Sequence, residues 1–196
     1  RRLEKYIEGL KRKKTYDRYE AKLMEFVELH FAERVRNKGE QPDRTNYIPH
    51  HGVNQQKEST KLRIVLDGSA TIDNGKSLND NLFKGVTNWD SWTLLHKFRL
   101  GPYALSADVE KAFLMIEVDE KDRDVLRFLW IDKNGQVMVY RFRRVPFGLS
   151  CPPFLLFVVI QYHLKAMSQE FPETASLLLD KFYVDDLLAA EFSTTR

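Results

Sequence analysis

The feature that most restricts the fold is a pair of adjacent carboxylates, Asp185 and Asp186, inside the apolar run KFYVDDLLAA at residues 181–190. Strand-forming residues flank the pair on both sides. An ionised carboxylate removed from water needs a counter-charge, and a neighbouring carboxylate increases that need. The pattern therefore predicts a hairpin, with one strand ending at Val184, a turn at the two aspartates and a second strand beginning at Leu187.

Aspartates are common in turns, so this pair alone is more typical of a solvated turn than of a site. A third carboxylate changes that balance, because Asp108 ends another predicted strand, PYALSAD, at residues 102–108. A strand-terminal acid beside the hairpin tip would complete a cluster of three. Carboxylate oxygens suit Mg²⁺, which binds through one or two carboxylates together with substrate phosphates. Two such ions about 3.5–4 Å apart support phosphoryl transfer.

The rest of the chain predicts a mixture of helices and strands. Leu23, Phe26, Val27 and Val35 recur at helical spacing, and Asn134-Gly135 is a hairpin signal between two strands. We expect helices over 2–13, 17–36 and from about 152 to 169, and strands over 61–67, 102–108, 124–132 and 137–145. We also expect a connector over 37–52, mostly loop over 68–93, and a run from 175 that leads into the final hairpin.

Composition limits the class of protein. The 196 residues are 43% hydrophobic and 12% aromatic, enough to bury a core in one large domain or two small lobes. The single cysteine, Cys151, excludes an intramolecular disulfide and favours a reducing compartment. The first twenty residues lack the apolar core of a signal peptide, and the longest apolar stretch, 154–160, is far below the roughly 20 residues of a membrane span. We therefore expect a soluble intracellular protein.

Charge is unevenly distributed around a net value of +3. Residues 1–20 hold eight Lys or Arg against four acids, whereas 145–196 hold three against six. A basic N-terminal segment and an acidic C-terminal segment suit a protein that binds a polyanion and concentrates carboxylates at one place. Taken singly, each charged run is also explained as a solvated face.

Four ordered blocks, STKLRIVLD, ADVEKAF, VPFGLSCPPF and FYVDD, resemble the fingers and palm of a reverse transcriptase. The longer sequence pattern, which also includes YIPHHGV, DGSA and SLND, resembles the Pao/BEL family of long-terminal-repeat retrotransposons over roughly residues 47–191. The resemblance implies an α/β (α+β) fold with a largely antiparallel palm sheet packed on helices and no thumb within these residues. It implies one domain made of a helical lead-in at 1–46, fingers at 47–100 and a truncated palm at 101–196.

The resemblance also implies roles for the acidic residues. Asp108, Asp185 and Asp186 stand at the catalytic aspartates and would hold two Mg²⁺ ions, which Mn²⁺ can replace, with help from the backbone carbonyl of Val109. Phe113 stands at the aromatic gate under the sugar of the incoming nucleotide, where a ring leaves no room for a 2′-OH. The implied substrate is therefore a dNTP.

Further residues are implied to bind the substrates. Arg63 matches the fingers arginine that clamps the triphosphate, a role that suits a planar guanidinium. A loop asparagine at position 79 either reaches the template or hydrogen-bonds its own backbone. The full implied set is Arg63, Lys61, Phe113, Phe147 and Gly148 for the nucleotide, and Asn79, Tyr183 and Val184 for the template and primer.

The resemblance thus implies an RNA-directed DNA polymerase that transfers a nucleotide from a dNTP to a primer on an RNA or DNA template. It implies a retrotransposon polyprotein that also carries an aspartic protease, an RNase H and an integrase, in a cytoplasmic particle or the nucleus. The alternative is a degenerate, non-catalytic remnant that binds nucleic acid or a protein. The presence of all three aspartates argues against a degenerate, inactive element. The absence of a thumb within these 196 residues predicts that they are weakly active or inactive alone.

Overall fold

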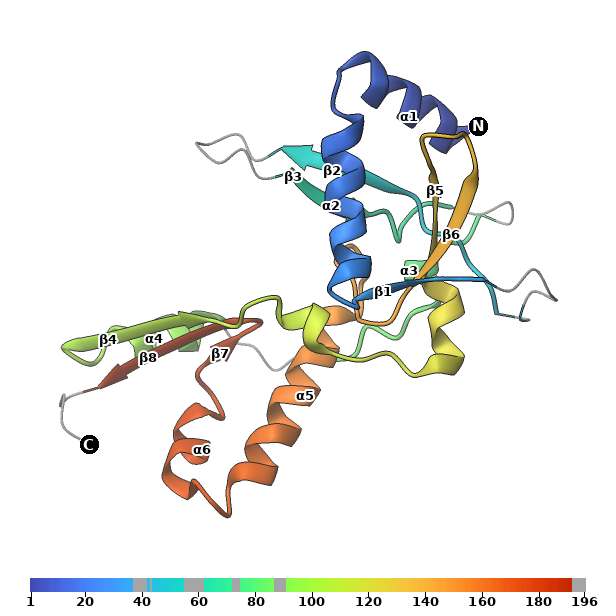
Figure 1. The fold of residues 1–196 in the computed structure, drawn as a ribbon. Coiled ribbons are helices and arrows are strands. Elements are labelled where there is room, and N and C mark those ends of the chain that lie inside the picture. The colour runs from blue at the N-terminus through green and yellow to red at the C-terminus, as the bar shows by residue number, and fades with distance from the viewer. Residues whose placement is uncertain (37–41, 43, 55–61, 72–74, 87–90, 192–196) are drawn as a thin grey trace. The chain divides into compact units, whose positions relative to one another are not determined.

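The structure is a computed structural model, and it describes residues 1–36, 42, 44–54, 62–71, 75–86 and 91–191 (Figure 1). The chain forms two compact units, each built from two separate stretches of sequence. Unit 1 comprises Arg1–Phe83 and Glu117–Ser150, and unit 2 comprises Lys84–Ile116 and Cys151–Arg196. The predicted division into a lead-in, fingers and palm stays a prediction.

Helices and antiparallel strands make up both units. The helices of unit 1 are α1 (Arg2–Arg12), α2 (Tyr16–Glu28), α3 (Leu78–Asn81) and the 3-10 helix η2 (Glu120–Leu126), and its strands are β1 (Ala32–Arg34), β2 (His50–Asn54), β3 (Leu62–Leu66), β5 (Arg127–Ile131) and β6 (Val137–Phe142). The helices of unit 2 are α4 (Ser91–Phe98), the 3-10 helix η1 (Ala112–Met115), α5 (Pro152–Met167) and α6 (Pro172–Leu178), and its strands are β4 (Tyr103–Asp108), β7 (Phe182–Tyr183) and β8 (Asp186–Glu191). The fold class is therefore α+β.

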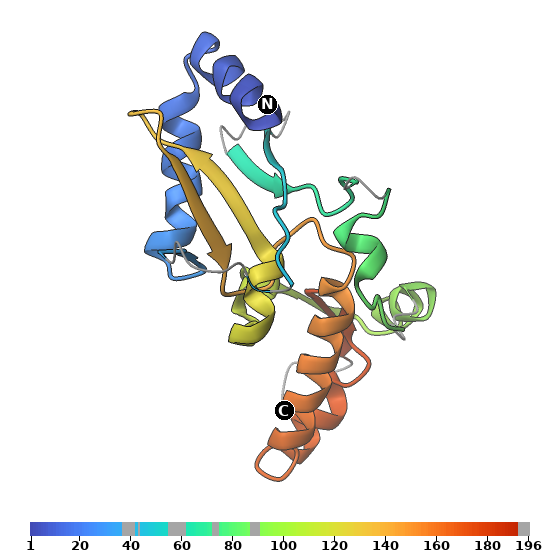
Figure 2. The same ribbon diagram turned by 90° about the vertical axis from the view of Figure 1, so that its right-hand side faces the viewer.

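Two small sheets lie in unit 1, one with strand order β1-β6-β5 and the other a β2-β3 pair. Aromatic rings from α2 and β5 join in its core, since Tyr16 and Tyr19 each stack on Trp130 with ring centroids 5.2 and 5.4 Å apart. Figure 2 shows the β5–β6 hairpin beside α2. Phe128 and Phe142 are fully buried in the same cluster. Large apolar side chains thus hold these elements together.

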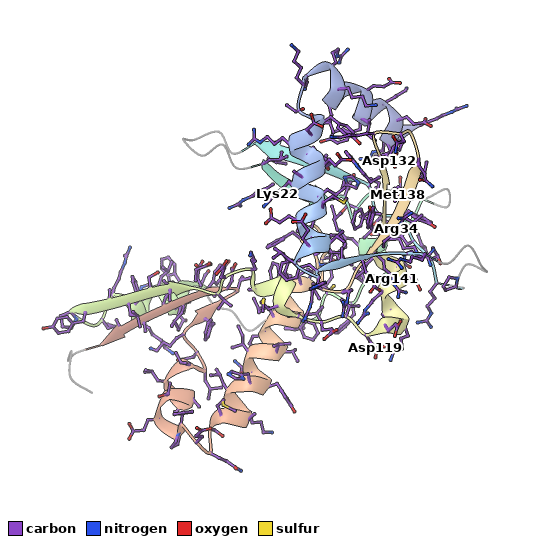
Figure 3. The ribbon with its side chains drawn as sticks, viewed as in Figure 1. Lys22, Arg34, Asp119, Asp132, Met138 and Arg141 are labelled. Atoms are coloured by element: carbon purple, nitrogen blue, oxygen red, sulfur yellow. The ribbon has the colours of Figure 1, made fainter. Side chains whose placement is uncertain are left out.

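A network of ion pairs supports the same unit. The Asp124 carboxylate accepts hydrogen bonds from Arg127 Nε at 2.8 Å and from Arg141 at 3.1 Å. Arg141, labelled on β6 in Figure 3, also donates to Glu33 of β1 at 2.7 Å. Because Asp124 and Arg127 are buried, each of these charges needs the other to offset the cost of leaving water.

Unit 2 contains a three-stranded antiparallel sheet in the order β4-β8-β7. Helix α4 packs on β8, and α5 packs on α6 and on η1. Helix α5 begins at Pro152, as the paired prolines predict, because a proline at the first helical position loses no hydrogen bond. The free cysteine, Cys151, is buried next to that helix start.

Several sequence predictions are confirmed and others are wrong. The strands predicted over 61–67, 102–108 and 137–145 are present as β3, β4 and β6. The helix predicted over 17–36 ends at Glu28, because Ala32–Arg34 form a strand that pairs with β6. The connector predicted over 37–52 is wrong at its C-terminal end, because strand β2 begins at His50.

Two helices of unit 2 are absent from the sequence prediction. Helix α4 begins at Ser91, inside the predicted loop, and α6 lies over Pro172–Leu178, where only a run into the final strand is predicted. Both are short, with 8 and 7 residues, so their periodicity is weak. Among the described residues, no helix is long and apolar enough to cross a bilayer.

Candidate active site

The predicted hairpin is present, with its turn one residue earlier than expected. Tyr183 pairs with Asp186 and Phe182 with Leu187, so Val184 and Asp185 form the turn and Asp186 begins β8. Val184 has a φ of +57°. A β-branched residue in the left-handed region is strained, and such strain is typical of sites where neighbouring structure fixes the backbone.

Strand β4 brings the third aspartate to this hairpin. Asp108 lies directly opposite Asp186 in the antiparallel register of β4 and β8. The backbone N–H of Val109 donates to the carbonyl oxygen of Asp185 at 2.9 Å, which ties the end of β4 to the turn. Residues directly opposite in an antiparallel pair point to the same face of the sheet, so the carboxylates of Asp108 and Asp186 share one face.

The three aspartates have no ion-pair partner among the described residues. Asp108 and Asp186 are exposed and Asp185 is partly buried. Among the residues that the structure describes, no Lys, Arg or His forms an ion pair with any of the three, and the nearby Lys111 pairs with Glu110 at 3.6 Å. Carboxylates that face one another in a strand pair without a protein cation leave room for a bound divalent ion as their counter-charge.

The fit to a metal ion is partial. Within the described ranges, no three Asp, Glu, His or Cys side chains gather as ligands of one ion. The backbone register nevertheless supplies two facing carboxylates, Asp108 and Asp186, with Asp185 one residue away in the turn. This donor set suits Mg²⁺, which uses one or two carboxylates and takes its remaining ligands from water and substrate phosphates.

The segment after Asp108 is held in a fixed shape. Lys111 has a φ of +53°, and η1 follows it directly, with Phe113 partly buried inside this single turn. The N–H of Ala112 donates to the carbonyl of Val109 at 3.2 Å, and that of Ile116 donates to the carbonyl of Phe113 at 3.1 Å. Packing of η1 on α5 thus fixes the backbone of Phe113 five residues beyond Asp108.

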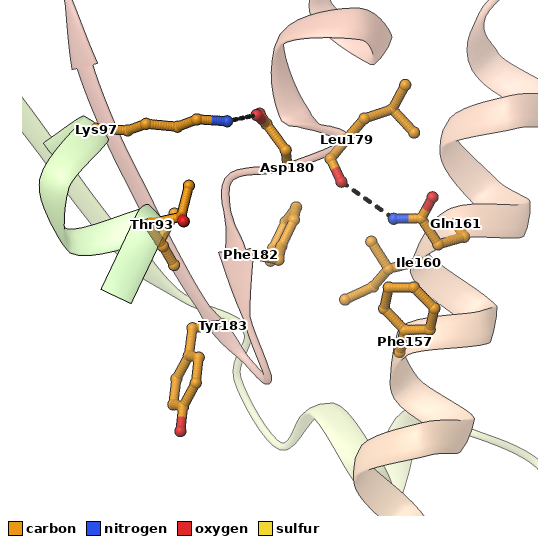
Figure 4. Close-up of a pocket in the computed structure, with 10 residues that line it drawn as sticks. Thr93, Lys97, Phe157, Ile160, Gln161, Leu179, Asp180, Phe182 and Tyr183 are labelled. Carbon is orange, nitrogen blue, oxygen red and sulfur yellow. Dashed lines mark hydrogen bonds and ion pairs between the residues drawn. The ribbon is translucent and has the colours of Figure 1, made fainter. Parts of the chain in front are cut away.

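A pocket of about 350 Å³ in unit 2 lies between α4, α5 and the strand that leads to the turn (Figure 4). Lys97 and Asp180 form an ion pair at this pocket, and Gln161 donates to the carbonyl of Leu179 at 3.2 Å. Asp180 has a pKa below its ordinary value because it accepts a hydrogen bond from Lys97. Tyr183 also lines the pocket, and its predicted contact with the template or primer stays a prediction.

Of the residues expected to bind the nucleotide, Phe113 belongs to unit 2, whereas Arg63, Phe147 and Gly148 belong to unit 1. Arg63 is exposed on β3, opposite Val53 of β2, and Phe147 and Gly148 are exposed in the loop after β6. Lys61 lies outside the described residues. Gly148 has a φ of +99°, and a Cβ at this position would lie 2.0 Å from the carbonyl oxygen of Leu66. The loop can therefore approach β3 only because residue 148 is a glycine.

Asn79 joins three segments of unit 1. Its Nδ2 donates to Ser69 Oγ at 2.9 Å and to the carbonyl oxygen of Gly148 at 3.4 Å, and its Oδ1 accepts from the N–H of Ser150 at 2.9 Å. Its own N–H donates to the carbonyl of Gly68 at 2.9 Å. Ser69 and Ser150 are not predicted as partners of Asn79, because they are 10 and 71 residues away and no spacing rule links them.

Comparisons with known proteins bear on the fold. No family model and no curated protein matches this chain. Among solved structures, it is similar to a foamy viral protease-reverse transcriptase in complex with double-stranded DNA, with 16% sequence identity and a TM-score of 0.58. The match covers 87% of this chain and 25% of that one, so the chain spans a quarter of the length of that protein. The chain therefore has a reverse-transcriptase-like fold.

Proposed function

We propose that this chain is part of an RNA-directed DNA polymerase. The observation that carries the proposal is the pairing of Asp108 with Asp186, beside Asp185 at a hairpin turn, in a chain with a reverse-transcriptase-like fold. In the proposed reaction a primer 3′-oxygen forms a bond to the α-phosphorus of a dNTP. The bond from that phosphorus to the bridging oxygen breaks, pyrophosphate leaves, and the hydroxyl proton passes to solvent.

The aspartates would serve this reaction by binding divalent cations. Asp108, Asp185 and Asp186 would hold two Mg²⁺ or Mn²⁺ ions, with the carbonyl of Val109 as a further ligand. When bound, such ions stabilise the charge that develops on the attacking and leaving oxygens. The chain's own contribution is the register of β4 and β8, which sets two carboxylates on one face before substrate arrives.

Other residues would bind and select the nucleotide. Arg63 would donate paired hydrogen bonds to the triphosphate, and Phe147 with Gly148 would support the base. Phe113, held by η1, would exclude a 2′-OH and so favour dNTPs over ribonucleotides. The role of Lys61 as a second phosphate contact belongs to the same proposal.

A basic groove in unit 1 supports a nucleic-acid partner. The groove has a volume of about 540 Å³, and Arg1, Arg2 and Lys5 line it together with Tyr6 and Tyr47. Its lining contains no acidic residue, and Arg2 pairs with Asp67, which is not part of that lining, at 2.8 Å. Cations beside aromatic rings bind the phosphates and bases of a single strand, so this groove is our candidate for the template. The assignments of Asn79, Tyr183 and Val184 to template or primer remain part of the proposal.

The sequence resemblance extends the proposal to the source of the chain. A Pao/BEL-type retrotransposon polyprotein, with an aspartic protease, an RNase H and an integrase, would supply the remaining activities. Such a polymerase would work in a cytoplasmic particle or in the nucleus.

Primer extension by the full-length protein tests the proposal. We expect incorporation of dNTPs that requires Mg²⁺ or Mn²⁺ and that Asp108→Asn or Asp185→Asn lowers by about 10³-fold, since each change removes several kcal/mol of charge stabilisation. Asp180→Asn is a matched control, because Asp180 is an exposed aspartate of unit 2 paired with Lys97. Synthesis that persists in Asp185→Asn, or without divalent cations, would contradict the proposal.

A further inference from the structure

We infer that Asn79 is a positioning residue that holds the Phe147–Gly148 loop against the end of β3, and thereby sets the affinity for the incoming nucleotide. The inference rests on the proposed function for its substrate. It assigns Asn79 a role different from direct contact with the template, which the sequence resemblance implies. All the contacts that support it lie within unit 1.

Both N–H donors and the carbonyl oxygen of the Asn79 amide have partners inside the protein. An asparagine amide offers two N–H donors and one carbonyl acceptor. Here the donors are directed to Ser69 Oγ and to the carbonyl of Gly148, and the oxygen accepts from the N–H of Ser150. A template contact through the donors would require at least one of these bonds to break. The geometry therefore favours an internal role.

Close backbone packing makes this junction sensitive to small movements. A Cβ at Gly68 would lie 2.7 Å from the carbonyl oxygen of Gly148 and 2.9 Å from Asn79 Oδ1. The loop also approaches Leu66 so closely that only a glycine fits at position 148. Two backbone segments that touch without side chains between them depend on hydrogen bonds for their alignment, and Asn79 supplies bonds to both segments.

The two segments carry different parts of the proposed nucleotide site. Strand β3 carries Arg63, five residues before Gly68, and the loop carries Phe147, whose exposed fraction is 45%. A shift between the segments would change the spacing between the triphosphate contact and the surface offered to the base. Asn79 lies where these segments meet, and so its loss is expected to weaken nucleotide binding more than the chemical step.

The test uses Asn79→Asp in the full-length protein, with Asn81→Asp as the matched control. Aspartate keeps the acceptor for Ser150 N–H but loses both donors, so the bond to the carbonyl oxygen of Gly148 is replaced by a repulsive contact between two oxygens, while the Ser69 hydroxyl can still donate to the carboxylate. Asn81 lies in the same helix, and its amide donates to the carbonyl of Ser77 at 2.8 Å, away from the loop. We expect Asn79→Asp to raise the KM for dNTP about tenfold with a much smaller change in kcat, and Asn81→Asp to leave both unchanged.

A second readout and a milder variant complete the test. Amide hydrogen exchange over residues 147–150 should accelerate in Asn79→Asp and not in Asn81→Asp. If Asn79→Asp does not fold, Ser69→Ala, which removes one exposed acceptor, should still raise the KM for dNTP by about two- to threefold.

The outcomes are separable. A raised KM with faster exchange at 147–150 supports the inference. If the wild-type protein is active, an unchanged KM for dNTP in Asn79→Asp overturns the inference. Unchanged amide exchange at 147–150 in this variant also overturns it. If the wild-type protein incorporates no dNTP, the proposed function fails and the nucleotide role of Asn79 fails with it, whereas the exchange measurement still decides whether Asn79 holds the loop.

Discussion

The two units are stabilised in different ways. Unit 1 closes around fully buried large side chains, among them Trp130, Tyr19, Phe128 and Phe142. Unit 2 leaves large apolar side chains in solvent, with Trp92 at 72% and Tyr162 at 76% exposure, and every residue of β4 is exposed. The comparison shows that side-chain packing dominates unit 1, whereas the placement of the aspartates in unit 2 depends mainly on backbone pairing.

Because of this difference, we expect the proposed nucleotide-binding residues of unit 1 and the aspartates of unit 2 to respond differently to mutation. The segments that carry Arg63 and Phe147 belong to a unit with a dense core, so their positions follow from many contacts. The three aspartates instead take their positions from the register of β4, β8 and β7. Side-chain truncation should therefore damage unit 1 far more than unit 2, and matched substitutions can measure the contrast.

The largest contrast is expected from one truncation made in each unit. Phe128→Ala removes a fully buried ring from unit 1 and should lower its free energy of unfolding by about 3–5 kcal/mol. Phe171→Ala removes a ring that is 51% exposed in unit 2 and should cost less than about 1 kcal/mol. Urea unfolding, monitored by amide hydrogen exchange in each unit, measures both changes in the free energy of unfolding. Equal losses would show that unit 2 has a core as tightly packed as that of unit 1.

A smaller contrast is expected for paired carboxylates. Asp124→Asn leaves the buried Arg127 without its anionic partner and should cost about 3 kcal/mol, because an uncompensated buried charge is unfavourable. Asp180→Asn breaks its pair with Lys97, both of which are substantially exposed, and should cost about 0–1 kcal/mol. The same unfolding experiments compare the two. A cost near zero for Asp124→Asn would mean that solvent reaches the ion-pair network.

Local sequence signals predicted much of this fold because the relevant information lies within a few residues. The Asn134-Gly135 turn, the start of α5 at Pro152 and the hairpin around the aspartates each follow from neighbouring residue types. The pairing of Asp108 with Asp186 is a long-range contact, and no local signal fixes it. The sequence predicts only that Asp108 lies beside the hairpin tip, from its place at a strand end and from the family resemblance.

The errors have a common physical cause, which is pairing between distant segments. Residues 32–34 continue the helical spacing of α2, yet they form β1 because Ala32 pairs with Phe142 of β6. The hairpin turn falls on Val184 and Asp185 because β8 must also pair with β4, and that register begins at Asp186. The partners of Asn79 are equally remote. Local patterns carry no information about such contacts.

The smallest predicted effect is a pH dependence confined to unit 1. His50 is buried, its Nδ1 is 2.6 Å from Tyr19 Oη, and its Nε2 is 2.9 Å from the carbonyl of Leu129. Burial lowers the pKa of this imidazole below its ordinary value of 6.5, so the folded state keeps it neutral. Below about pH 6.5 the unfolded chain binds the proton more readily, and stability therefore falls as the pH decreases.

The slope from one such histidine is at most about 1.4 kcal/mol per pH unit. His50→Gln should reduce the pH slope of the free energy of unfolding of unit 1 between pH 7 and 5 by up to this value. The slope is compared because the substitution can also lower the stability at pH 8, where the histidine is neutral in both states. His163→Gln, at an exposed position of α5 in unit 2, should leave the profile of unit 1 as in wild type. If the slope is the same in His50→Gln and wild type, carboxylates of the ion-pair network cause the acid sensitivity, and the contrast between the units then comes from their ion pairs as well as from their cores.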